Sequence, residues 1–252
     1  MDEKINENVD TGATGSPKTL LSVLDNFWYH YKWHTIVAIF LIFAITVCSL
    51  QMCSKVQYDV HVLYSGSHEI ERTSANGDMA EYPTFISSFE RVVEDYDSDG
   101  NVSLSIKDLF MVSEEEIEQI LKENENAEIN RTLLSENKSI LSETLIYSDY
   151  YVCLLSPCVY NEYKTIDGIE IFSPLSQYVK DGVEVEYYTE SAIYLSSTGF
   201  YSLPGISNLP SDTLICLRGV SAFANHFNKK DATEARRRAI DVIENMINYT
   251  QN

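Results

Sequence analysis

The run DYDSDGNV at residues 95–102 is the pattern in this sequence that comes closest to metal chemistry. Its alternating carboxylates, its glycine at position six and its apolar residue at position eight match the first two-thirds of an EF-hand calcium loop. Position twelve is Ile106, where such a loop has a bidentate glutamate, and a strand rather than a helix is expected to follow. Asp and Gly also form ordinary turns for conformational reasons, so a turn without metal is the alternative. The predicted Ca²⁺ ligands are Asp95, Asp97, Asp99 and Asn101.

A second candidate site lies where the predicted strands end. Strands are expected at residues 58–64, 102–110 and 150–156, with Lys107 and Asp108 near the end of the second. Open α/β sheets place ligands beyond the carboxyl ends of their parallel strands. The candidate ligand-binding residues are Ser65, Gly66, Ser67, Ser156 and Pro157.

Sequence motifs of catalysis are absent. The chain has no G-x-S-x-G elbow, no P-loop, no G-x-G-x-x-G and no H-E-x-x-H. His61 falls within a predicted strand and His68 within a loop, positions typical of structural or simply exposed histidines. We therefore expect a protein that is not an enzyme.

The five cysteines are too few for a disulfide scaffold. Cys153 and Cys216 lie in apolar strand patterns, and Cys158 follows just beyond the first of them. The pattern favours buried thiols that act as small hydrophobic groups, with a Cys153–Cys158 bridge as the alternative.

The elements that must position these residues indicate an α/β domain over residues 55–252. The continuous apolar run at residues 150–156 is typical of a buried parallel strand. Ser113 and Glu116 have the spacing of a capping box and predict a helix start. Further helices are expected at residues 85–93, 133–145, 159–163 and 231–249, and further strands at 183–195 and 213–218. This order predicts a three-layer α/β domain with a mixed sheet.

The stretch at residues 35–53 carries no charge and predicts a single transmembrane helix. At 1.5 Å per residue it would span about 28 Å, close to the hydrocarbon core of a bilayer. Residues 1–19 have the composition of a disordered tail, and residues 20–34 predict an interfacial helix with an aromatic belt. A cleaved signal peptide is disfavoured because the run starts late and lacks an A-x-A-like site.

The orientation follows from the long domain after the span. Lysines and arginines are few on both sides, so the positive-inside rule discriminates weakly. A short tail followed by a long domain predicts a cytoplasmic N-terminus and an extracytoplasmic C-terminal domain in the cell membrane.

The formal charge of −20 excludes some classes of partner. A strongly acidic domain is not suited to nucleic acid or to the surface of anionic lipid. The lipid bilayer around residues 35–53 remains the one partner that composition predicts.

Several phrases resemble extracellular solute-binding proteins of ABC importers. They are SDYYVCLLS at 148–156, YNEY at 160–163 and SPLSQY at 173–178. The phrases YLSSTGFY at 194–201, LICLR at 214–218 and WYHYKWH at 28–34 resemble small membrane-anchored relatives from clostridial bacteria. This chain has room for one lobe and a remnant of the second, so the resemblance implies a reduced lobe.

Together these patterns predict a membrane-anchored extracytoplasmic domain that binds a small solute or an envelope protein. A structural or scaffolding envelope protein without a small-molecule ligand is the alternative. The acidic loop adds Ca²⁺ as a candidate cofactor.

Overall fold

The computed structural model describes residues 20–53, 58–72, 82–124, 128–220 and 229–250. The chain divides into two units, Met1–Val56 and Gln57–Asn252. The predicted tail at residues 1–19 lies outside the described residues.

Helix α1 (Leu20–Cys53) runs without a break through the predicted interfacial and transmembrane segments. Its apolar window, Phe27–Ser49, has 23 residues and no burial within the protein. At 1.5 Å per residue this window is about 34 Å long, enough to cross the hydrocarbon core of a bilayer. A membrane anchor and a signal sequence share these properties, and the aromatic residues ahead of the charge-free run favour the anchor.

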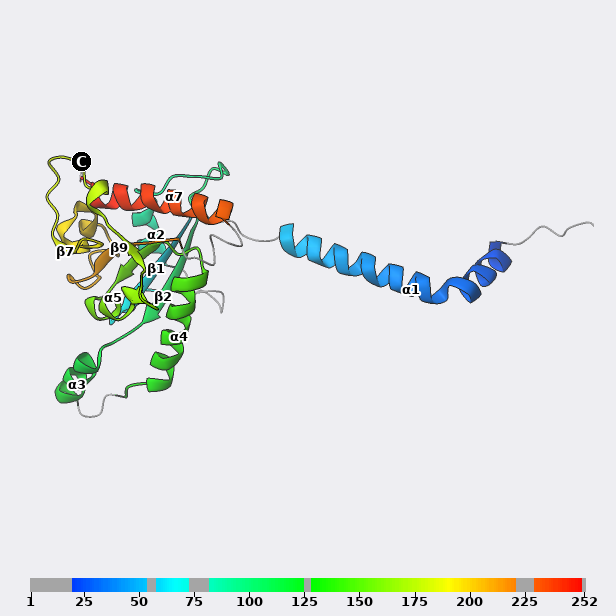
Figure 1. The fold of residues 1–252 in the computed structure, drawn as a ribbon, viewed down its shortest axis with the longest axis horizontal. Helices are drawn as coiled ribbons and strands as arrows, with labels where there is room; N and C mark the ends of the chain where they lie inside the picture. Colours follow the sequence, from blue (N-terminus) through cyan, green and yellow to red (C-terminus); the bar gives the residue numbers. More distant parts are fainter. Residues whose placement is uncertain (1–19, 54–57, 73–81, 125–127, 221–228, 251–252) are drawn as a thin grey trace, which may run out of the picture. The chain divides into compact units, whose positions relative to one another are not determined.

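A mixed seven-stranded sheet forms the centre of the second unit (Figure 1). Its first three strands in space are parallel, and the strands that follow are antiparallel, which confirms the predicted mixed sheet. The spatial order is β2 (Leu104–Phe110), β1 (Val60–Gly66), β3 (Val152–Leu155), β9 (Leu214–Arg218), β8 (Ala192–Tyr194) and β7 (Tyr187–Thr189), with β6 (Phe172–Ser173) also paired to β9.

Helices cover both faces of the sheet. Successive residues of a strand point to opposite faces, and apolar side chains on both faces of this sheet pack against helices. Val62 of β1 belongs to a core with helices α2 (Pro83–Phe89) and α7 (Lys229–Ile247). Its neighbour Leu63 belongs to the opposite core, with α4 (Arg131–Tyr147) and α5 (Pro157–Tyr163). Two cores on two faces of one sheet give the predicted three layers.

Helix α3 (Glu114–Glu123) lies beyond the carboxyl end of β2 (Figure 1). The predicted capping box is confirmed: the Glu116 N–H donates to Ser113 Oγ at 3.1 Å, and the Ser113 N–H donates to Glu116 Oε2 at 2.7 Å. The box fixes the direction in which the chain leaves the sheet.

Several element boundaries differ from the sequence prediction, and some of these differences bear on the candidate sites. Strand β1 extends through Ser65 and Gly66, so these two candidate ligand residues pair within the sheet. The predicted strand at 183–195 is instead the hairpin of β7 and β8, because a turn at Glu190 reverses the chain. Strands β4 (Thr165–Ile166) and β5 (Ile169–Glu170) form a separate small hairpin around a turn at Asp167 and Gly168.

Candidate functional site

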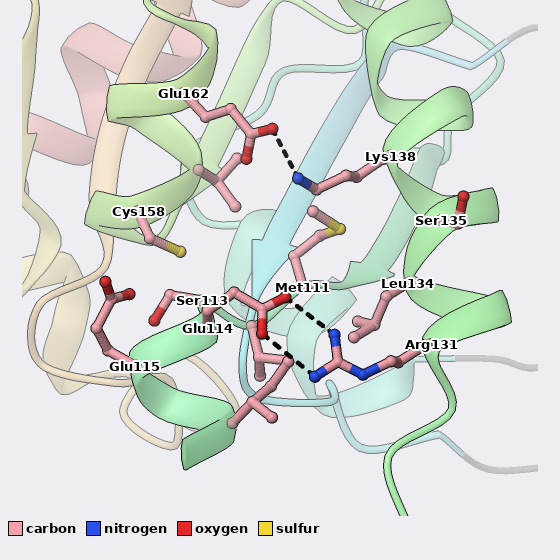
Figure 2. A pocket seen from close by; sticks show the side chains of 13 residues that line it. Met111, Ser113, Glu114, Glu115, Arg131, Leu134, Ser135, Lys138, Cys158 and Glu162 are labelled. Carbon is pink, nitrogen blue, oxygen red and sulfur yellow. Dashed lines mark hydrogen bonds and ion pairs between the residues drawn. The ribbon is translucent and has the colours of Figure 1, made fainter. Parts of the chain in front are cut away.

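A groove of about 430 Å³ lies beyond the carboxyl ends of β2 and β3, between α3, α4 and α5 (Figure 2). This is the edge of the parallel strands where open α/β sheets place ligands. The residues that line the groove are Met111, Val112, Ser113, Glu114, Glu115, Ile117, Arg131, Leu134, Ser135, Lys138, Cys158, Val159 and Glu162.

The end of β1 holds the chain segments that form the base of the groove. The Met111 N–H donates to the Gly66 carbonyl at 2.8 Å, and the Ser156 N–H donates to the Ser65 carbonyl at 2.9 Å. Gly66 is required for this close approach. A Cβ atom at Gly66 would lie 2.9 Å from Tyr64 Oη and 3.4 Å from Ser156 Cβ.

Two ion pairs cross the groove from one helix to another (Figure 2). Arg131 of α4 binds both carboxylate oxygens of Glu114 in α3, at 3.1 and 3.3 Å. Lys138 of α4 binds Glu162 of α5 at 2.8 Å. All four side chains are about half exposed or more, so water and solutes reach them. The groove therefore has cations on one wall and carboxylates on the other.

The floor of the groove is apolar. Met111, Ile117 and Val159 line the groove and are almost completely buried, whereas the charged side chains that line it are exposed to water. Leu134 of α4 adds a half-buried apolar contact. An apolar floor with a few charged groups at its rim is the usual composition of a small-molecule site.

Cys158 places a half-buried thiol in the groove, 3.2 Å from Ser156 Oγ. Burial raises the pKa of the Cys158 thiol above its usual value, more than the hydrogen bond with Ser156 lowers it. The thiol is therefore neutral near pH 7, and a neutral thiol is a weak nucleophile. Cys158 adds a polarisable sulfur to the lining of the groove.

The candidate ligand residues taken from the sequence lie beside this groove. Ser65 is fully buried, and Gly66, Ser67, Ser156 and Pro157 adjoin the groove without lining it. Their direct role in binding stays a prediction.

The sequence patterns did not identify the charged residues of the groove. The signal was present in Arg131 and Lys138, which stand seven positions apart and therefore share a helical face. Their acidic partners on α3 and α5 could be identified only from the fold.

The acidic loop brings two of its predicted ligands together with a third carboxylate. Oxygens of Asp59, Asp95 and Asp97 lie within 4.8 Å of one another. Asp59 is 3% exposed, and its carboxylate accepts from the Tyr96 N–H and from the Ser103 N–H, each at 2.8 Å. Three converging carboxylates are a donor set that suits a hard cation.

Asp99 and Asn101 serve the loop backbone. Asp99 Oδ1 accepts from the Asn101 N–H at 2.8 Å, and Asp99 is outside the group of converging carboxylates. Gly100, at φ 92°, adopts the left-handed conformation that favours glycine. The loop is thus a tight turn held by its own aspartates.

The surroundings of Asp95 and Asp97 shift the pKa values of these two carboxylates in opposite directions. The Gly100 N–H donates to Asp95 at 2.9 Å and is the main reason that the pKa of Asp95 is lowered. The Asp99 N–H lowers the pKa of Asp97, but desolvation and the charges of Asp99 and Asp59 outweigh it, and that pKa is raised. A bound cation would offset the repulsion from Asp59 and Asp99 that contributes to the raised pKa of Asp97.

The three cysteines of the α/β domain are all free thiols. Cys153 of β3 stands opposite Cys216 of β9 in the antiparallel register, and both are fully buried. The interpretation as small buried hydrophobic groups fits these two residues, while Cys158 faces the groove.

No protein-family model matches the chain, and comparisons with curated proteins and with solved structures likewise give no match. Inference of a function therefore rests on the groove, the acidic loop and helix α1.

Proposed function

We propose that the chain is a membrane-anchored binding protein of the cell envelope. Helix α1 holds the α/β domain at the membrane, with the N-terminus in the cytoplasm and the domain outside. The domain acts as a reduced solute-binding lobe that takes a small ligand in the groove between α3, α4 and α5.

The observation that carries this proposal is the groove itself. It combines an apolar floor with exposed charges of both signs at the carboxyl edge of the parallel strands. The neutral Cys158 thiol gives the groove no activated nucleophile. These groups suit binding without catalysis.

A scaffolding protein without a ligand is the second candidate, and one observation favours it. The charges of the groove already satisfy one another, because Arg131 pairs with Glu114 and Lys138 with Glu162. Under this alternative, the two pairs serve only to tie α4 to its neighbours.

We also propose that the acidic loop binds Ca²⁺ through Asp59, Asp95 and Asp97. Support comes from the convergence of the three carboxylates and from the raised pKa of Asp97. The affinity should be weak, about 10⁻⁴ to 10⁻³ M, as in extracellular modules. This metal would stabilise the junction between α2 and β2.

Thermal unfolding of the full-length protein in mild detergent tests the binding proposal. The panel consists of amino acids, short peptides, sugars and nucleosides, each added at increasing concentration. A solute that binds only the native state stabilises it by about 2.7 kcal/mol at 100 times its Kd. A flat response to every class would favour the scaffold.

Two neighbouring tryptophan substitutions show whether binding occurs in the groove. Leu134→Trp places a large ring in the groove and should abolish stabilisation by the solute. Leu133→Trp is the matched control, because Leu133 is exposed on the same helix and does not line the groove. Equal responses of the two variants would place the ligand elsewhere.

A further inference from the structure

The charges of the groove are sorted by sign, and this sorting selects a class of ligand. Arg131 and Lys138 both project from α4, whereas Glu114 belongs to α3 and Glu162 to α5. A ligand of one sign would meet attraction on one wall and repulsion on the other. A dipolar ligand with separate positive and negative ends fits both walls.

The spacing of the charges sets the length of that ligand. Arg131 and Lys138 are seven positions apart (138 − 131), which corresponds to about 10 Å along a helix. Each cation contacts its own glutamate at about 3 Å, so the two ion pairs are separated by a similar length along the groove. A single amino acid is too short for this separation. An extended peptide of three residues spans about 10 Å.

The geometry also sets the direction of the peptide. Arg131 already presents its guanidinium fork to a carboxylate, through two hydrogen bonds to Glu114. A peptide carboxylate can take up the same bidentate arrangement. At the other end, Glu162 accepts from the ammonium of Lys138 and can accept from a peptide ammonium in the same way.

Displacing the existing ion pairs costs little. Glu114 and Lys138 are 70% and 51% exposed, so each returns to water when the peptide replaces it. Exposed ion pairs of this kind contribute little to the stability of the fold. A peptide can therefore replace both ion pairs at a small cost in free energy.

The floor accommodates the middle of the ligand. Met111 and Val159 are apolar residues that line the groove, and methionine adapts to irregular shapes. Such a floor selects weakly among small apolar side chains. Selectivity comes from the two charged ends.

We propose that the groove binds a short peptide of about three residues with free termini, its carboxylate on Arg131 and its ammonium on Glu162. This inference rests on the proposed function, since it names the solute that the groove takes. It requires no conformational step and no cofactor.

Titration calorimetry of the full-length protein in detergent tests the inference with four probes. They are trialanine, N-acetyl-trialanine, trialanine amide and free alanine. Trialanine should bind. Each blocked peptide should bind at least about tenfold more weakly, because each lacks one charged end. Free alanine should also bind at least about tenfold more weakly, because it cannot reach both ends.

Variants assign each end of the peptide to its residue. In Arg131→Gln, trialanine should bind no better than its amide, and in Glu162→Gln no better than its acetylated form. Lys180→Gln is the matched control, because Lys180 pairs with Glu244 at 3.5 Å and neither residue lines the groove. The control should bind trialanine like the wild type.

The outcomes separate this inference from the proposed function. Equal binding of the free and blocked peptides to the wild type overturns the inference without the use of any variant. If a different class of solute stabilises the protein and Leu134→Trp abolishes the effect, the peptide inference falls and the proposed function stands. If no solute of any class binds, both fall.

Discussion

Arg218 is a buried cation that joins the end of α4 to strand β9. Its side chain is 1% exposed. Its Nη1 group donates to the Leu145 carbonyl at 2.8 Å, Nη2 donates to the Ser148 carbonyl, and Cζ lies 4.3 Å from the ring centroid of Tyr151. The guanidinium thereby satisfies carbonyls at the C-terminus of α4, where a positive charge is also favoured by the helix dipole.

Replacement of Arg218 by alanine removes both hydrogen bonds and leaves these carbonyls without their donor. Each buried acceptor that loses its partner costs about 1–3 kcal/mol, and the empty space adds a further cost. Alanine also removes the cost of burying a guanidinium, the cost that lowers the pKa of Arg218. The expected net loss is about 3 kcal/mol of unfolding free energy.

Urea denaturation of the full-length protein in detergent, followed by circular dichroism, measures this loss. Arg218→Lys should recover part of it, because a single ammonium keeps the charge but not the planar fork. Arg131→Ala is the control: its half-exposed ion pair should contribute at most about 1 kcal/mol. A loss for Arg218→Ala as small as that of Arg131→Ala would refute the assigned role.

Three further predictions concern His61, the acidic loop and Gly66. Burial lowers the pKa of His61, more than Asp149 raises it, so the unfolded state binds the proton more readily. The unfolding free energy should therefore fall as the pH drops below about 6.5, and His61→Phe should flatten this dependence in denaturation at several pH values. Ca²⁺ at 100 times its Kd, which is about 10–100 mM for the expected affinity, should raise the unfolding free energy by about 2.7 kcal/mol in wild type and in Asp99→Ala but not in Asp97→Ala. If calcium leaves the unfolding free energy of the wild type unchanged, the loop is a simple turn. Gly66→Ala should cost roughly 1–3 kcal/mol in the same assay, because the added Cβ meets Tyr64 Oη, and an unchanged midpoint would contradict the close packing there.

Much of the fold could be predicted from local sequence patterns. The apolar run before Pro157 forms a buried strand, since no residue in it could face water, and the Ser113–Glu116 box forms because its two hydrogen bonds join residues three positions apart. The charge-free run at residues 35–53 lies within a single helix, as its length and composition predicted. Such local patterns predict a helix or a strand, but they do not predict which other elements it packs against.

The sites depend on contacts between distant parts of the chain. Asp59 joins the acidic loop because β1 pairs with β2, which sets the Asp59 N–H 2.9 Å from the Ser103 carbonyl. The prediction that Asp99 shares the ion with Asp95 assumed an EF-hand geometry. The backbone of this turn uses the Asp99 carboxylate instead. The opposite charges of the groove come from three helices, whose packing no spacing in the sequence encodes.

Labelling of Cys158 in intact cells tests most directly the claim of an anchored domain with an open groove outside the membrane. The reagent is a membrane-impermeant maleimide, applied at mildly alkaline pH because the Cys158 thiol is neutral near pH 7 and the thiolate is the form that reacts. The protein carries Cys48→Ser and Cys53→Ser so that the fully buried Cys153 and Cys216 are the only other thiols. We predict that the label appears on protein in the membrane fraction without permeabilisation and is lost in Cys158→Ser. Labelling only after permeabilisation would place the domain inside the cell, and labelled protein released into the medium would identify α1 as a cleaved signal sequence. Either result would contradict the claim.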